Sequence, residues 1–252
     1  RIVVPCKQNR DAFKDIGVTV PIDVAVLGVD PEQWRFADRK NRSGPYTFLM
    51  SAGITYRKNP LALANAFVKA FPKSKDVRLI FKTRGEGTAG GFREWAKSLP
   101  DDKRITVVME ESTPKQMERW MHEADAFVFP SRGEGFGLTP VQAMSTGLPV
   151  IVSDNSGMSE YCNRRYNYPI PCKEVPVPHQ NAGGYPEAWG DVGNWWDPDF
   201  DALVETMRDL SCQHDKARRK GELAAKWVRQ NWTIEHTCRR LLDVVERDFE
   251  RC

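Results

Sequence analysis

Between residues 46 and 153 the sequence alternates short apolar segments with amphipathic ones, and this alternation constrains the fold more than any other feature. Short continuous apolar runs are typical of strands buried on both faces, and apolar residues at helical spacing are typical of amphipathic helices. The expected strands cover residues 47–52, 77–82, 105–109, 126–129 and 149–153. The expected helices cover residues 60–71, 91–99, 114–124 and 138–146. This pattern predicts an α/β fold with a doubly wound, parallel, Rossmann-like sheet.

The loops that follow these strands are expected to meet at one edge of the sheet. In an open parallel sheet, ligands bind beyond the carboxyl ends of the strands. The expected ligand-binding rim is therefore made of the loops at residues 53–59, 83–90, 109–113 and 130–137. Candidate functional residues are expected in these loops.

The loop at 130–137 carries the most specific signal, because it is rich in glycine and precedes a helix. Its glycines allow the backbone to turn sharply and to approach a ligand closely; they are Gly133, Gly135 and Gly137. The helix that begins near Leu138 leaves its first N–H groups without partners, and such groups favour an anion such as phosphate. Glu134 and Gln142 are expected to face the same ligand, because helical side chains lean toward the N-terminus.

This arrangement resembles the donor-site signature of family 4 of the retaining glycosyltransferases, enzymes with the GT-B fold of two facing Rossmann-like domains. In that family an acidic residue in the glycine-rich turn is followed eight positions later by a second acidic residue. This chain has Glu134 at the first position and Gln142 at the second. The resemblance implies that Glu134 is the catalytic residue and contacts the donor sugar, and that the Gln142 amide binds the ribose.

The resemblance also assigns the other contacts to a nucleoside diphosphate sugar. Arg57 and Lys58 are expected to neutralise the diphosphate. Main-chain atoms of Met109 and Glu110 are expected to read the base. Backbone N–H groups are expected to bind the phosphates or the sugar at Gly135, Phe136, Gly137 and Leu138. Neither a metal ion nor a cofactor is expected, because the sequence shows no carboxylate-rich metal cluster and Arg, Lys and a helix N-terminus meet the phosphate charge.

The same resemblance predicts the domain organisation. Residues 1–45 would be the end of an N-terminal domain and the crossing from it. Residues 46–231 would form the donor-binding domain, with a long loop or insertion near 162–190, and residues 232–252 a C-terminal helix. The N-terminal, acceptor-binding domain is then missing from this chain, so the chain alone is expected to be inactive. Any peripheral membrane contact is expected to come through that missing domain.

Two other functions remain open. Gly85, Gly87 and Gly90 have the spacing of a dinucleotide fingerprint, and Glu110 follows at about the distance at which an acid binds a ribose diol. This pattern indicates an NAD(P)-binding oxidoreductase domain, although the fingerprint normally lies in the first strand–turn–helix unit. The amide at Gln142 indicates the other alternative, a nucleotide-sugar-binding module without catalytic activity.

Composition argues against several further classes. The net charge of +3 is small, and the densest basic run, at 216–220, lies on an expected helix with acidic residues nearby, so nucleic acid is not an expected partner. The six cysteines include no Cys-x-x-Cys pair, so no zinc site or disulfide framework is indicated and a reducing, cytoplasmic compartment is expected. The sequence has no apolar run long enough to span a bilayer and no signal-peptide pattern at its start.

Overall fold

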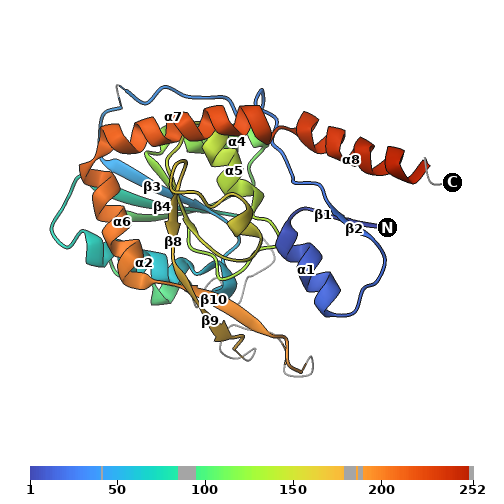
Figure 1. Cartoon of the computed structure of the whole chain (residues 1–252). Coiled ribbons are helices and arrows are strands. Elements are labelled where there is room, and N and C mark those ends of the chain that lie inside the picture. Colours follow the sequence, from blue (N-terminus) through green and yellow to red (C-terminus); the bar gives the residue numbers. More distant parts are fainter. Residues whose placement is uncertain (41, 85–94, 179–185, 187–189, 250–252) are drawn as a thin grey trace.

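The computed structural model describes residues 1–40, 42–84, 95–178, 186 and 190–249 (Figure 1). Its centre is a six-stranded parallel sheet with the strand order β5-β4-β3-β6-β7-β8. The strands are β3 (Tyr46–Ser51), β4 (Val77–Thr83), β5 (Ile105–Met109), β6 (Ala126–Phe129), β7 (Val150–Ser153) and β8 (Tyr168–Ile170). The predicted doubly wound α/β fold is confirmed.

Helices cover both faces of this sheet and give the molecule three layers (Figure 1). Successive residues of a strand point to opposite faces, so each face has its own buried core. Phe48 of β3 belongs to the core under α2 and α6, and its neighbour Leu49 belongs to the core under α4, α5 and α7. The helices are α2 (Pro60–Ala70), α4 (Pro114–Glu123), α5 (Leu138–Ser145), α6 (Phe200–Cys212) and α7 (His214–Asn231).

Local sequence signals explain where several helices begin. At the start of α4, the Thr113 hydroxyl accepts from the Gln116 backbone N–H, and the Gln116 side chain accepts from the Thr113 N–H. This capping box satisfies two donors that the helix would otherwise leave unpaired. Pro60 and Pro114 occupy the first positions of α2 and α4, where the missing N–H has no helical partner in any case.

The segment near 162–190, predicted as a long loop or insertion, contains regular strands. It contains β8, the sixth strand of the main sheet, and β9 (Cys172–Pro176), which pairs antiparallel with β10 (Asn194–Pro198). The sequence does not reveal β8 because this short strand carries a central proline, which a sheet tolerates at its edge. It does not reveal the β9–β10 hairpin because the two strands are far apart in sequence and no two-residue turn joins them.

Other predictions are met in part or stay predictions. Of the helix expected at 91–99, residues 95–98 are helical and 91–94 lie outside the described residues. The C-terminal helix is present as α8 (Ile234–Phe249). The division of the chain into domains near residues 45 and 231 stays a prediction.

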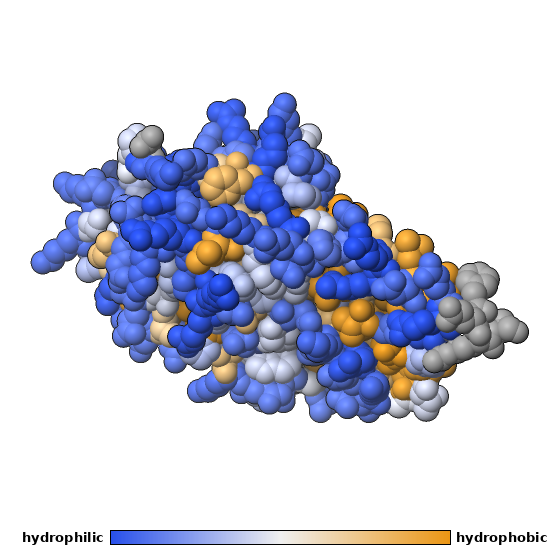
Figure 2. All heavy atoms as spheres, turned by 45° about the horizontal axis from the view of Figure 1, so that its top comes forward, coloured by the Kyte–Doolittle hydropathy of each residue, from blue (hydrophilic) through white to orange (hydrophobic). Residues whose placement is uncertain are grey.

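The N-terminal residues and α8 form an extension at one end of the molecule, where both termini lie (Figure 1). The N-terminal part consists of β1 (Ile2–Val4), α1 (Lys7–Asp15) and β2 (Ile22–Val24), and β1 and β2 are parallel. Figure 2 shows hydrophobic side chains gathered at this end. Exposed apolar residues there include Ile16, which is 77% exposed, and Leu242, which is 59% exposed.

Candidate functional site

The strand order reverses between β3 and β6, the two central strands of the sheet. The chain runs from β3 outward through β4 to β5, returns to β6 on the other side of β3, and runs outward again through β7 to β8. The loops after β3 and β6 therefore leave in opposite directions and open a crevice, the usual ligand site in such sheets. A cavity of about 450 Å³, here called the rim cavity, lies at these strand ends. Its lining includes Ser51, Gly53, Lys58, Lys82, Glu110 and Gln142.

The glycine-rich loop between β6 and α5 holds its backbone in a tight conformation. Gly137 has a φ of +77°, and a Cβ atom at this position would lie 2.8 Å from the Tyr161 hydroxyl oxygen. That hydroxyl donates a hydrogen bond of 2.8 Å to the Gly137 carbonyl and thereby fixes the start of α5. Among the residues that the structure describes, none accepts a hydrogen bond from the backbone N–H groups of Gly135, Phe136, Gly137 and Leu138. These donors are available to an anion at the helix N-terminus.

The side chain of Phe136 serves packing, so only its backbone is available to a ligand. Its ring is buried, with its centroid 5.8 Å from that of Tyr161 and 5.7 Å from that of Trp232. These contacts attach the glycine-rich loop to the main core. The loop is therefore a rigid support for groups that face the rim.

Glu134 is the centre of a cluster that joins two loops. Its Oε1 atom lies 2.5 Å from the Lys58 ammonium, 2.6 Å from the Ser131 hydroxyl and 3.0 Å from the Arg57 guanidinium. Arg57 also donates to the Gly133 carbonyl. Arg57 and Lys58 belong to a short 3₁₀ helix, η1 (Tyr56–Lys58), which follows β3 and lies beside the loop after β6. The structure thus brings together the predicted catalytic residue and both predicted diphosphate-binding cations.

The positive charge of Lys58 is held in a partly dehydrated place. Burial lowers the pKa of Lys58, whereas the adjacent Glu134 carboxylate favours the charged form. The Lys58 ammonium also lies 5.0 Å from the centre of the Phe129 ring. Because the surroundings are less polar than water, the ammonium interacts more strongly with a bound anion than an exposed lysine would.

Three further predicted residues lie at or near the rim cavity. Gln142 lines it from α5, and within the described ranges its side-chain amide makes no hydrogen bond to the protein. Glu110 lines it from the end of β5, whereas Met109, which is 43% exposed, lies next to Glu110 in the chain and is not part of the lining. The main chain of Glu110 is engaged: its N–H donates to the Thr83 carbonyl at 3.2 Å, and its carbonyl accepts from the Lys82 ammonium.

Lys82 and Arg132 also belong to the rim, although the sequence predicted neither. Lys82 lies near the end of β4, is 3% exposed and lines the rim cavity. A lysine at the carboxyl end of an apolar strand is a signal that could have found it. Arg132 donates to Asp197 of β10 at 2.7 Å and to the Tyr56 carbonyl of η1 at 2.6 Å. No local pattern reveals Arg132, because its partners are far away in the sequence.

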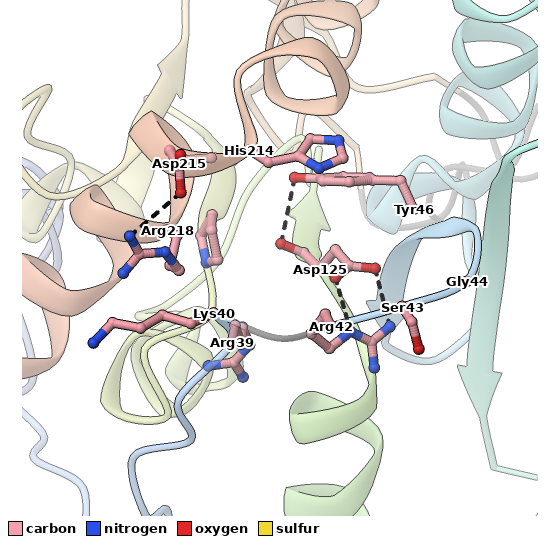
Figure 3. Close-up of a pocket in the computed structure, with 12 residues that line it drawn as sticks. Arg39, Lys40, Arg42, Ser43, Gly44, Tyr46, Asp125, His214, Asp215 and Arg218 are labelled. Carbon is pink, nitrogen blue, oxygen red and sulfur yellow. Dashed lines mark hydrogen bonds and ion pairs between the residues drawn. The ribbon is translucent and has the colours of Figure 1, made fainter.

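A second, smaller cavity of about 120 Å³ lies at the opposite edge of the sheet, near the amino ends of the strands (Figure 3). Its charged groups largely satisfy one another. Arg42 forms hydrogen bonds of 2.9 and 3.0 Å with Asp125, and Arg218 pairs with Asp215 at 3.4 Å. The buried Arg39 donates to backbone carbonyls at the ends of α4 and α5. These contacts stabilise the fold, and the carboxyl edge is therefore the better candidate for function.

The glycines of the alternative dinucleotide fingerprint, Gly85, Gly87 and Gly90, lie outside the described residues. These positions follow β4 in the chain, whereas the first strand of the sheet in chain order is β3. Among the described residues there is no group of three or more His, Cys, Asp or Glu side chains that could hold a metal ion. No helix in this part of the chain is long and apolar enough to cross a membrane.

Comparison with known proteins identifies the class to which this fold belongs. Residues 32–176 match the model of the family "Glycosyl transferases group 1". The chain belongs to this family. The predicted membership of the glycosyltransferases is thus confirmed at the level of the family group.

Individual relatives cover only part of the chain. It is 54% identical over 113 residues to the lipopolysaccharide core biosynthesis mannosyltransferase LpsB of Rhizobium meliloti. The aligned residues make up 42% of this chain and 31% of that protein. It is 28% identical over 144 residues to a glycogen synthase of Mycobacterium tuberculosis. The aligned residues make up 55% of this chain and 33% of that protein. The chain spans about a third of the length of these curated relatives.

Solved structures share the fold at low sequence identity. A glycosyltransferase from Rickettsia africae matches with a TM-score of 0.79 and 14% identity, over 100% of this chain and 64% of that chain. Anabaena Alr3699/HepE, solved in complex with UDP and glucose, matches with a TM-score of 0.77 and 12% identity, over 97% of this chain and 62% of that chain. These similarities support the GT-B fold.

Proposed function

We propose that this chain is the donor-binding, C-terminal half of a retaining glycosyltransferase of family 4, a hexosyltransferase-like enzyme. It would bind a nucleoside diphosphate sugar at the rim cavity and transfer the sugar to an acceptor held by a separate N-terminal domain. The observation that carries the proposal is the Glu134–Lys58–Arg57 cluster beside the unpaired N–H groups at the start of α5. A carboxylate, two cations and a helix N-terminus together suit a ligand in which a sugar is bonded to a diphosphate.

Each group has a distinct role in this proposal. Arg57, Lys58 and the helix N-terminus stabilise the negative charge that develops on the diphosphate as the bond to the sugar breaks. The Glu134 carboxylate orients the sugar and stabilises its developing positive charge. Gln142 donates and accepts hydrogen bonds with the ribose hydroxyls through its uncharged amide. The protein's own cations then replace a metal ion at the phosphates, so the reaction is proposed to need none.

The proposed acceptor domain is supported by the short span of the chain relative to its curated relatives. We assign the acceptor and any membrane contact to that domain. We also propose a cytoplasmic location, on the basis of the cysteine pattern; recovery of the native protein in the periplasmic or secreted fraction would contradict it.

The experiment is calorimetric titration of the chain with UDP, GDP, ADP and NAD, each with and without magnesium. Binding of one or more nucleoside diphosphates that does not depend on magnesium is the expected result. Binding of NAD alone would favour the dinucleotide-binding alternative at Gly85, Gly87 and Gly90 instead. Nucleotide binding by an intact protein that transfers no sugar would favour the non-catalytic module that Gln142 suggests.

A further inference from the structure

Lys82 is a buried cation in the rim cavity to which neither the family resemblance nor the proposed function assigns a role. It lies in β4, next to β5 and two strands away from β6. Lys82 is only 3% exposed, yet it lines the rim cavity together with Glu110 and Gln142. Lys82 is therefore a lining residue of the cavity with little contact to bulk solvent.

The hydrogen bonds of Lys82 leave part of its capacity unused. The ammonium group has three N–H donors and no acceptor. One donates to the Glu110 carbonyl and another to the Thr83 carbonyl at 3.3 Å. Lys82 forms no ion pair with any residue that the structure describes. Within the described part of the chain, one N–H donor of the Lys82 ammonium thus remains for a ligand in the cavity.

The position of Lys82 indicates which part of a donor it would meet. Neighbouring strands are about 4.8 Å apart, so the end of β4 lies about 10 Å from the end of β6 and from the helix start that would hold the phosphates. Gln142, the proposed ribose contact, lines the same cavity. A nucleoside diphosphate with its phosphates at α5 would extend through the ribose toward β4. The base would then lie next to Lys82.

The chemistry of an ammonium group selects among bases. It can only donate, so it fits an edge that presents acceptors, such as O6 and N7 of guanine or O4 of uracil. Adenine and cytosine present an amino group at the corresponding position, and this donor faces the ammonium unfavourably. We propose that Lys82 reads the base of the donor and selects a keto base, uracil or guanine, over adenine and cytosine. This inference rests on the proposed function and specifies the donor that the same site accepts.

Burial supports this assignment. Burial of a cation is costly, and desolvation lowers the pKa of Lys82, whereas the nearby Glu110 carboxylate favours its charged form. The two carbonyl bonds also connect the ends of β4 and β5, so Lys82 could act as a structural brace alone. A brace would affect every nucleotide alike, whereas a base-reading donor affects only those with a keto base.

The test is calorimetric titration of the unmodified chain and of Lys82→Met with UDP, GDP, CDP and ADP. We expect the unmodified chain to bind UDP or GDP roughly tenfold more tightly than ADP and CDP. Lys82→Met should remove this preference and change ADP affinity less than about twofold, because Met keeps the length of the side chain without its donors. Lys226→Met, at an exposed position of α7, is the matched control.

Two results would overturn the proposal. The first is an equal loss of affinity for all four nucleotides in Lys82→Met, and the second is preferential binding of ADP or CDP by the unmodified chain. If Lys82→Met does not fold, the same titrations of Lys82→Gln and the base preference of the unmodified chain test the proposal. Failure of the proposed function looks different, because the unmodified chain would then bind none of the nucleotides.

Discussion

The ammonium of Lys58 and the carboxylate of Glu134 lie 2.5 Å apart, although 76 positions separate them in the sequence. Lys58 follows β3 and Glu134 follows β6, so this ion pair joins the two loops that flank the reversal of strand order. The exposed fractions of the two side chains are 17% and 10%. The pair therefore connects the two loops and holds both charges at the position proposed for the diphosphate and the sugar.

Replacing Lys58 by Met should weaken nucleoside diphosphate binding by about 1–3 kcal/mol, because one charged contact to the phosphates is lost. Calorimetric titration with the nucleotide that the unmodified chain prefers measures the effect. Lys226→Met removes an exposed lysine of α7 and serves as the control. An unchanged dissociation constant would show that Lys58 does not contact the phosphates.

Replacing Glu134 by Gln should lower the turnover of the intact protein by on the order of 100- to 1000-fold, because the amide cannot stabilise positive charge on the sugar. Nucleotide affinity should stay the same or rise, since a negative charge near the phosphates is removed. Steady-state transfer assays and titrations on the same preparation separate these effects. Glu205→Gln changes an exposed acid on α6 and is the control. Turnover within twofold of normal would exclude Glu134 from the mechanism.

Gly137→Ala should destabilise the fold by about 1–3 kcal/mol, because its φ of +77° disfavours a side chain and the new methyl group would meet the Tyr161 hydroxyl. Gly135→Ala is the matched comparison, since a Cβ atom there has no neighbour within 4 Å. Urea unfolding of both variants measures the difference. Equal stability of the two would contradict the strain assigned to Gly137.

Arg132 is expected to position η1 and the β9–β10 hairpin against the glycine-rich loop. Its guanidinium carbon lies 4.2 Å from the centre of the Tyr56 ring, in addition to its hydrogen bonds with the Tyr56 carbonyl and Asp197. Arg132→Ala should increase hydrogen exchange in η1 and β10 and weaken nucleotide binding. Arg132→Lys should restore these properties only in part, because lysine lacks the planar fork. Arg219→Ala, at an exposed position of α7, is the control and should change neither property. Hydrogen exchange in η1 and β10 of Arg132→Ala that is as slow as in the unmodified chain would rule out the positioning role.

The acid stability of the protein should depend on Glu118 of α4. This carboxylate forms hydrogen bonds of 2.9 and 3.0 Å with the Arg35 guanidinium, which holds the pKa of Glu118 below its ordinary value of 4.5. Because the folded-state pKa is lowered, the pair stabilises the fold above pH 4.5, and the contribution is lost as the pH falls through the folded-state pKa. Glu118→Gln should be less stable than the unmodified chain at pH 7, and the difference should shrink below pH 4.5. A constant difference in urea unfolding from pH 7 to pH 3 would contradict this.

Periodicity was sufficient to predict the central part of the fold. The expected strands at 105–109 and 126–129 coincide with β5 and β6. The central strand β6 is buried throughout, which requires a continuous apolar run. α1 was not predicted because its residues are mostly polar or charged, and none of them is buried in the structure. β8 and β9 lack an apolar run of their own and depend on pairing partners elsewhere in the chain.

The candidate site shows the same division between local and distant information. Glu134, Gln142 and the glycines belong to one short segment, so a motif brings them to attention together. The contacts of Arg132 with Tyr56 and Asp197 arise only when β3, β6 and β10 are assembled. Lys82 was overlooked because the sequence shows it as the polar end of an apolar strand, and its burial follows from pairing with β3 and β5.

The position of β3 at the centre of the sheet has a consequence for folding of the protein during translation. One edge of β3 can pair with β4 soon after β4 emerges from the ribosome. The other edge stays unpaired until β6 emerges, because Phe48 of β3 pairs with Ala126 of β6. During this interval a flat, apolar strand edge is exposed to other nascent chains, a recognised route to aggregation. Translation that pauses before residue 126 would prolong this exposure. The crevice with its Lys58–Glu134 pair therefore forms only after Glu134, 76 positions after Lys58, has emerged.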